Sequence, residues 1–161
     1  MPPLNPVDRI SVFIGEKFSV VFLASVIVTV YEVVMRYVFN SPTIWVHDTA
    51  IALSATGFFL AGTYALQRRE HIRISVVYDA MPARLRGVID LINAALTATY
   101  FAFLLYAGLK QAIPSVMIPE TTGHAWDVPI PAYLKSTLVV ATAIMLAQAL
   151  VQLAPLVRRR N

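Results

Sequence analysis

The chain has 161 residues, of which 58% are hydrophobic and 14% are charged. Its mean hydropathy is +0.67, and the charges leave three long stretches uncharged, a pattern that excludes a single water-soluble globule. The absence of cysteine excludes disulfides, thiolate metal sites and thiol nucleophiles. We therefore expect an all-α membrane protein whose formal charge of +4 marks its topology and does not indicate a nucleic-acid partner.

Four stretches are long and apolar enough to cross the hydrocarbon core, which takes about 20 helical residues. Three contain charge-free runs, at 49–67, 91–109 and 136–157. The first stretch is rich in β-branched residues, but lipid requires each backbone to satisfy its own hydrogen bonds, so we expect a helix there too. We predict four transmembrane helices with short interfacial helices, forming one domain over 1–161 with spans at about 12–38, 48–67, 88–112 and 133–157.

The connections between the spans differ in character. Residues 39–48 open with turn formers and then offer Trp45 at interfacial depth, which favours a short interfacial helix. Residues 71–82 place apolar side chains at helical spacing until Pro82, which predicts an amphipathic segment along the inner membrane surface. Residues 113–132 contain four prolines and a glycine, so we predict an outer loop.

The basic residues indicate which side each connection faces. Ten of the thirteen Lys and Arg residues lie at the start of the chain, between the second and third spans, or at its end. By the positive-inside rule these segments are cytoplasmic. We therefore expect both termini in the cytoplasm, with Arg36, Lys110 and Lys135 on the opposite side of the membrane.

Three ionisable residues near the outer side are candidates for contacts with a partner. Glu32 and Arg36 lie four residues apart on one helix, so they either pair with each other near the headgroups or present a charge pair to a partner protein. Asp48 opens the second span, where it either stabilises the helix N-terminus or accepts a hydrogen bond from Arg36.

The second span carries small residues at intervals of four, Gly57, Ala61 and Ala65. Such a stripe lets a neighbouring helix approach closely. That neighbour is either a helix of a partner subunit or another helix of this chain.

The sequence lacks the residue patterns of a cofactor site or an enzyme. His47, His71 and His124 lie outside the spans and are not at metal-ligand spacings, so we expect neither haem nor a bound metal. The chain has no nucleophile-elbow pattern, no phosphate-binding glycine loop and no paired carboxylates at catalytic spacing. We expect a protein without cofactors that is not an enzyme.

Several motifs occur in a characteristic order along nearly the whole chain. They are Arg36-Tyr37-Val38-Phe39-Asn40 closing the first span, Trp45 and Asp48 opening the second, Gly62 and then Arg68-Arg69-Glu70-His71-Ile72-Arg73 at its end, and Trp126, Pro129, Pro131 and Tyr133 before the last span. This order resembles the small membrane subunit, of the DctQ type, of TRAP (tripartite ATP-independent periplasmic) transporters. The chain departs from that pattern at Asp48, where the family more often has glutamate, and at Ser75, where aspartate is common.

The resemblance implies a non-catalytic subunit in the bacterial inner membrane. It would serve as a scaffold for a large multispan subunit of the DctM type, which imports an organic acid with a sodium gradient and is supplied by a periplasmic binding protein of the DctP type. The outer-side residues Glu32, Arg36, Trp45 and Asp48, and the stripe of Gly57, Ala61 and Ala65, are then expected to contact these partners.

Two alternative functions fit the hydropathy profile. One is a self-sufficient, proton-coupled small exporter working as a homodimer with Glu32 as its coupling site, which requires an acid nearer mid-span. The other is either a structural or assembly four-span protein or the small subunit of a tripartite tricarboxylate transporter.

Overall fold

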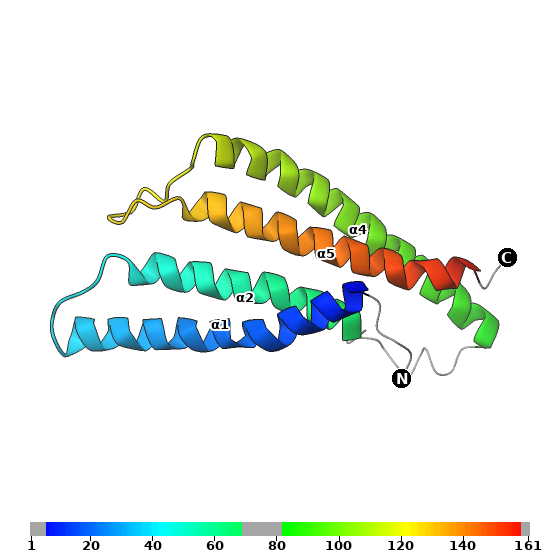
Figure 1. Ribbon diagram of the computed structural model, residues 1–161, viewed down its shortest axis with the longest axis horizontal. Helices are drawn as coiled ribbons and strands as arrows, with labels where there is room; N and C mark the ends of the chain where they lie inside the picture. Colours follow the sequence, from blue (N-terminus) through cyan, green and yellow to red (C-terminus); the bar gives the residue numbers. More distant parts are fainter. Residues whose placement is uncertain (1–5, 69–81, 159–161) are drawn as a thin grey trace.

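The computed structural model describes residues 6–68 and 82–158, and these ranges form four long α-helices. The helices are α1 (Pro6–Tyr37), α2 (Val46–Arg68), α4 (Ala83–Met117) and α5 (Ile130–Arg158), as Figure 1 shows. All four are long and apolar enough to cross a membrane, and no strand occurs in the described ranges. The predicted all-α class with four membrane-spanning helices is therefore confirmed. Of the predicted amphipathic segment 71–82, all but Pro82 lies outside the described residues, as does Ser75.

The helix α4 runs one turn further than the sequence predicted, because it includes Pro114. A proline within a helix leaves the carbonyl four residues earlier without its usual partner. Pro114 lies in the last turn of α4, and its own carbonyl accepts the N–H of Ile118 at 2.9 Å, which closes the helix end. The connection between α4 and α5 therefore covers residues 118–129, and is shorter than the predicted loop at 113–132.

The prediction of a short interfacial helix within residues 39–48 is wrong, because no separate helix lies between α1 and α2. The chain leaves α1 by a tight turn in which Asn40 adopts the left-handed conformation, with φ of 50°, and the N–H of Ser41 donates to the carbonyl of Met35 at 2.9 Å. Asparagine tolerates this conformation and commonly ends helices in this way. Extended residues follow, including Pro42, and α2 begins directly at Val46.

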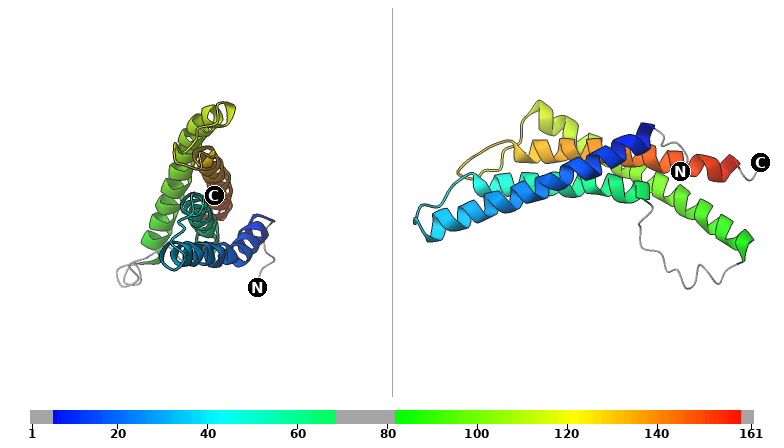
Figure 2. Two further views of the ribbon diagram at one scale, coloured as in Figure 1. Left: turned by 90° about the vertical axis from the view of Figure 1, so that its left-hand side faces the viewer. Right: turned by 60° about the horizontal axis from the view of Figure 1, so that its bottom comes forward.

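The four helices form two hairpins that are joined in the middle. In each hairpin, α1 with α2 and α4 with α5, the two helices pack along one another, and α2 then packs against α5. Figures 1 and 2 show that α1 and α4 lie on the outside of this arrangement. Most of the buried residues accordingly lie on α2 and α5.

Each of the three helix contacts includes a glycine facing a larger side chain. The pairs are Gly57 of α2 with Phe22 of α1, Gly62 of α2 with Met145 of α5, and Gly108 of α4 with Val139 of α5. A Cβ built on Gly57 would lie 2.7 Å from Phe22 Cζ, which is closer than van der Waals contact permits. The absence of side chains at these positions thus lets the helices approach closely, as is common in membranes.

Polar side chains cross-link the same helices. The hydroxyls of Ser25 and Ser54 join α1 to α2 at 2.8 Å, and the hydroxyls of Thr56 and Tyr133 join α2 to α5 at 2.8 Å. Gln152 Nε2 of α5 also donates to the carbonyl of Leu66 at 2.8 Å. Because lipid tails are as apolar as leucine, such hydrogen bonds and close packing take the place of the hydrophobic effect between membrane helices.

We expect Gly57→Ala to destabilise the chain by about 1 to 3 kcal/mol, because the new methyl group must displace the Phe22 ring. The matched control is Gly87→Ala on α4, where nothing lies within 4 Å of the built Cβ. That change removes a helix-interior glycine and is expected to be neutral or slightly stabilising. Thermal unfolding in a mild detergent measures both, and equal transition temperatures for the two variants would contradict the close packing at Gly57.

Candidate functional site

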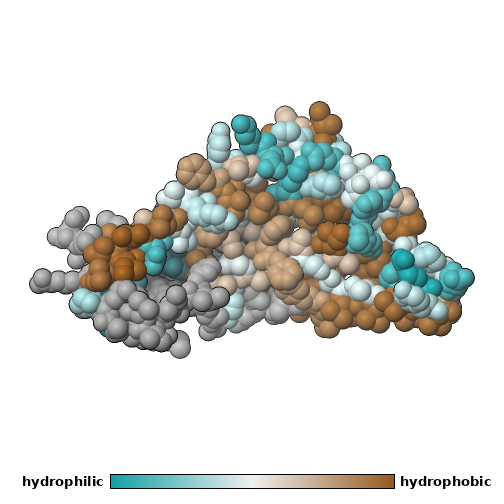
Figure 3. Space-filling model, turned by 180° about the vertical axis from the view of Figure 1, so that it is seen from behind, coloured by the Kyte–Doolittle hydropathy of each residue, from teal (hydrophilic) through white to brown (hydrophobic). Residues whose placement is uncertain are grey.

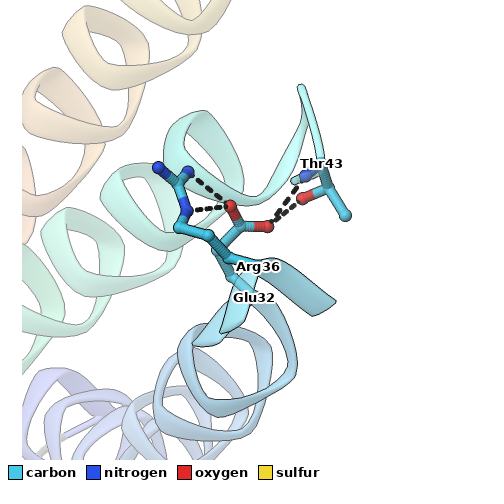
Figure 4. Close-up of polar contacts among 3 residues, drawn as sticks. All are labelled: Glu32, Arg36 and Thr43. Carbon is cyan, nitrogen blue, oxygen red and sulfur yellow. Dashed lines mark hydrogen bonds and ion pairs between the residues drawn. The ribbon is translucent and has the colours of Figure 1, made fainter. Parts of the chain in front are cut away.

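The polar side chains outside the helix contacts gather at the end of the molecule that carries the connections 38–45 and 118–129, which we call the loop end (Figure 1). The first cluster there closes the α1–α2 hairpin. Arg36 donates to Glu32 Oε1 from Nε at 3.0 Å and from Nη2 at 2.5 Å. The other carboxylate oxygen accepts the N–H of Thr43 at 3.1 Å and also its hydroxyl, as Figure 4 shows.

These contacts bear on the two predicted roles of Glu32 and Arg36. Both carboxylate oxygens of Glu32 accept hydrogen bonds within the chain, so Glu32 fixes the connection between α1 and α2. The Arg36 side chain is 52% exposed, against 14% for Glu32. Glu32 and Arg36 thus pair with each other, and only the guanidinium of Arg36 presents a substantial surface to another molecule.

Trp45 belongs to the same closure of the hairpin. Its ring lies 5.8 Å from the ring of Tyr31 on α1, measured between centroids, and the residue is half-buried. The aromatic contact and the Glu32–Thr43 contact both hold the second half of the connection against α1. Trp45 therefore stabilises the fold of the loop end through a contact within the chain.

Asp48 pairs with the second connection of the loop end and does not pair with Arg36. Its carboxylate is 2% exposed, with Oδ1 at 2.9 Å from His124 Nδ1 and Oδ2 at 3.4 Å from the Thr122 hydroxyl. The residue also lies in the first turn of α2, where the helix dipole favours a negative charge. The predicted Asp48–Arg36 contact is thus replaced by one with residues more than 70 positions away in the sequence.

The connection 118–129 is folded so that His124 faces Asp48. Gly123 adopts a left-handed conformation, with φ of +67°, and its N–H donates to Asp127 Oδ1 at 3.1 Å. The N–H of Asp127 donates to the carbonyl of His124 at 3.0 Å, and the N–H of Thr122 donates to the carbonyl of Val128 at 3.2 Å. His124 is the residue that sequence reasoning missed, because nothing in its neighbourhood identifies the distant carboxylate.

The sequence-predicted stripe on α2 does not present one continuous free surface. Gly57 is buried against Phe22 of the same chain, so it is not available to a partner. Ala65 is half-buried and Ala61 is exposed. Of the two predicted neighbours of this stripe, the structure supplies a helix of the chain itself at Gly57.

The described residues at the loop end offer few side chains suited to binding a metal ion or a cofactor. Within residues 6–68 and 82–158, no group of three His, Cys, Asp or Glu side chains is arranged to hold a metal ion. His47 and His124 approach each other with ring centroids 5.9 Å apart, and both are exposed. The two histidines therefore belong to the solvated surface, and the buried carboxylate of Asp48 lies beside His124.

Four apolar helices closed at one end by two hydrogen-bonded connections define a small multispan membrane protein. The family model for the DctQ component of tripartite ATP-independent periplasmic transporters matches residues 25–159, and the chain belongs to this family. The chain is also similar to the C4-dicarboxylate TRAP transporter small permease protein DctQ of Vibrio cholerae serotype O1, with 27% identity over 126 residues. That match covers 74% of this chain and 52% of the relative, so the chain spans about half the length of the relative. The predicted resemblance to the small membrane subunit of TRAP transporters is confirmed.

We expect His124→Ala to loosen the connection 118–129, because the buried Asp48 carboxylate loses its shortest contact. A hydrogen bond to a charged group contributes about 1.5 to 3 kcal/mol, so amide exchange in this connection should accelerate about 10-fold or more. Hydrogen–deuterium exchange at constant pH measures this effect. The control is His47→Ala, which removes an exposed ring near the same place, and similar exchange in the two variants would show that Asp48 does not hold the connection.

The contact between Lys135 and Glu120 predicts a pH dependence at the other end of this connection. The hydrogen bond from Lys135 lowers the pKa of Glu120 below its ordinary value of 4.5. The folded-state pKa is thus below the unfolded value, so the contact stabilises the folded chain fully above about pH 4.5 and this contribution is lost as the pH falls through the folded-state pKa.

An NMR titration of the Glu120 carboxyl group is expected to give a midpoint below 4.5, and Lys135→Met is expected to raise that midpoint. Lys110→Met removes a different exposed lysine and should leave the midpoint unchanged. A midpoint that is the same in all three proteins would remove Lys135 as the cause.

Proposed function

We propose that this chain is the non-catalytic scaffold subunit of a sodium-driven, binding-protein-dependent transporter that imports an organic acid across the bacterial inner membrane. Its partners are a large multispan subunit of the DctM type, which moves the substrate, and a periplasmic substrate-binding protein of the DctP type. Membership of the DctQ family supports this assignment, and the similarity to a C4-dicarboxylate TRAP transporter small permease protein supports an organic acid as substrate.

The observation that carries the proposal is the lack of a charged residue in the middle of three spans. The runs 49–67, 91–109 and 136–157 contain no Asp, Glu, Lys or Arg. In the first span, Glu32 lies near the loop end with both oxygens engaged by Arg36 and Thr43. Ion-coupled carriers place their ion and substrate sites near the midplane, at ionisable groups or broken helices. A scaffold needs no such site.

The charge distribution supports a topology with both termini in the cytoplasm. Within the described residues, Arg9, Arg68, Arg84 and Arg158 lie at the end of the bundle opposite the loop end. The positive-inside rule then assigns that end to the cytoplasm and the loop end to the periplasm. Arg36 and the connection 118–129 thereby face the side on which a binding protein docks.

The alternative functions have less support. A proton-coupled exporter would use Glu32 as its coupling site. Both carboxylate oxygens of Glu32 are instead engaged by Arg36 and Thr43, and these hydrogen bonds hold the α1–α2 connection. A small subunit of a tripartite tricarboxylate transporter shares the hydropathy profile, but the family match is to the TRAP component.

The test is reconstitution into vesicles with an imposed sodium gradient. We expect no uptake of C4-dicarboxylates by the chain alone, and uptake when its cognate large subunit and binding protein are added. Transport by the chain alone would exclude the scaffold role. Failure of the chain to co-purify with the large subunit from mild detergent would do the same.

Within the same experiment, Arg36→Ala is expected to reduce co-purification or uptake about 3-fold or more, because it removes the exposed guanidinium and two of the hydrogen bonds that hold Glu32. Arg9→Ala is the matched control, since Arg9 is an exposed arginine on the same helix at the opposite end. Full assembly and full uptake with Arg36→Ala would remove Arg36 from the partner contact.

A further inference from the structure

The two outer helices leave large apolar faces uncovered, and these faces differ in one respect. Figure 3 shows how much of one side of the molecule is apolar. Both α1 and α4 expose many large hydrophobic side chains. Apolarity alone does not distinguish a face that meets lipid from one that meets protein. The polar groups within each face do, because lipid tails offer them no hydrogen bond.

The face of α1 is suited to lipid. Tyr31 is 44% exposed, but it lies toward the loop end, where its ring contacts Trp45. Between Val20 and Val30 the exposed side chains other than Thr29 are aliphatic, among them Val26, Ile27 and Val30. The exposed Thr29 donates its hydroxyl to the carbonyl of Ser25 at 2.8 Å, one turn earlier in the same helix. Nothing in this stretch therefore requires a partner outside the chain.

The face of α4 contains polar groups without partners. Tyr100 is 62% exposed and Tyr106 is 66% exposed, and neither hydroxyl makes a hydrogen bond within the part of the chain that the structure describes. The side chain of Asn93 is in the same situation, although its backbone carbonyl accepts the hydroxyl of Thr97. Asn93 and Tyr100 are two helical turns apart and so lie on one side of α4, with Phe103 beside them.

The depth of these groups makes lipid an unsuitable neighbour. The charge-free run 91–109 has Tyr100 at its midpoint. At 1.5 Å per residue, Tyr106 and Asn93 lie about 9 and 10 Å from that point, inside a hydrocarbon core whose half-thickness is about 15 Å. Tyrosine normally lies at the membrane interface, where its hydroxyl reaches water. From the midplane the Tyr100 hydroxyl does not reach the interface, so its acceptor must come from another protein surface.

A second copy of this chain is a poor occupant of the same face. Lys110 is exposed and follows Phe103 by two helical turns, so it lies on the same side of α4. In a symmetric pair of α4 helices, each Lys110 would approach the Lys110 of the other copy, and such like-charge contacts are unfavourable. A different chain can instead place oxygen acceptors opposite Tyr100 and a negative group near Lys110.

We propose that a membrane helix of the large transport subunit packs on the α4 face around Asn93, Tyr100, Phe103 and Tyr106 and accepts hydrogen bonds from the two tyrosine hydroxyls, while the α1 face remains toward lipid. This inference rests on the proposed function and adds to it which side of the chain meets the partner. The tyrosines are positioned for this contact because α4 lies on the outside of the bundle (Figure 2).

The test uses the full chain co-expressed with its large subunit and a photoreactive residue, p-benzoylphenylalanine, in place of either Phe103 on α4 or Ile27 on α1. Both positions are exposed, at 70% and 60%, so neither replacement disturbs the chain's own packing. We expect illumination to link position 103 to the large subunit and to give no such product from position 27.

A second pair of variants tests the hydroxyl groups themselves. Tyr100→Phe combined with Tyr106→Phe is expected to lower the fraction of large subunit retained in mild detergent about 3-fold to 10-fold, because two hydrogen bonds within the membrane are lost. Thr29→Val on α1 removes a hydroxyl that is already bonded within its own helix, and it should leave retention unchanged.

Three outcomes overturn the inference while the wild-type complex still co-purifies. They are cross-linking to the large subunit from position 27 and not from position 103, a cross-linked product of two copies of this chain from position 103, and no protein product from either position. Failure of the wild-type chain to retain the large subunit is a separate result, because it overturns the proposed function and this inference together.

Discussion

The contact between α2 and α5 is the constraint on which the rest of the structure depends. Each hairpin buries one of its helices in this contact, and at the loop end Asp48 of one hairpin also pairs with His124 of the other. The contact relies on close approach at Gly62, on the Thr56–Tyr133 hydrogen bond and on the Gln152 amide. Within a membrane, such features replace the hydrophobic effect as the source of attraction between helices. Because α2 and α5 pack against each other in the middle of the molecule, α1 and α4 are the helices with faces available to lipid or protein.

The loop end is organised by two carboxylates, each of which holds a different connection. Glu32 ties α1 to the start of α2 through Thr43, and Asp48 ties the start of α2 to the connection before α5. Each of the two acids thus accepts hydrogen bonds from a different connection, and together they close the bundle at the loop end. A surface built in this way is held in shape by the chain itself, which suits a surface that receives a partner without large rearrangement.

The number and position of the helices could be predicted from the sequence, because charge-free runs of about 20 residues have few structural solutions in lipid. The helix ends could not be predicted to the same degree. The prolines of residues 113–132 predict a loop from residue 113, yet α4 continues through Pro114 and ends at Met117. Residues 39–48 predict turn formers followed by a short interfacial helix, but Asn40 completes a tight turn after α1 and no separate helix precedes α2 at Val46.

The contacts of the candidate site were harder to predict than its members. The sequence identified Glu32, Arg36, Trp45 and Asp48, but for Asp48 it offered only stabilisation of its own helix N-terminus or a hydrogen bond from nearby Arg36. The observed partner, His124, is 76 residues away and is brought there by the packing of α2 against α5. Gly57 illustrates the same limit, since a row of small residues indicates a close helix neighbour without indicating to which chain that neighbour belongs.

The unequal lengths of the helices have a consequence for how the chain sits in a bilayer. With 35 residues, α4 is about 52 Å long, whereas α2 has 23 residues and is about 35 Å long. Only α2 matches a hydrocarbon thickness of about 30 Å closely, so α4 must lean or carry its polar ends into the headgroup layer. The immersion depth of the chain is therefore set by α2, the shortest helix. Thinning or thickening of the surrounding lipid would change the inclination of α4, the longest helix.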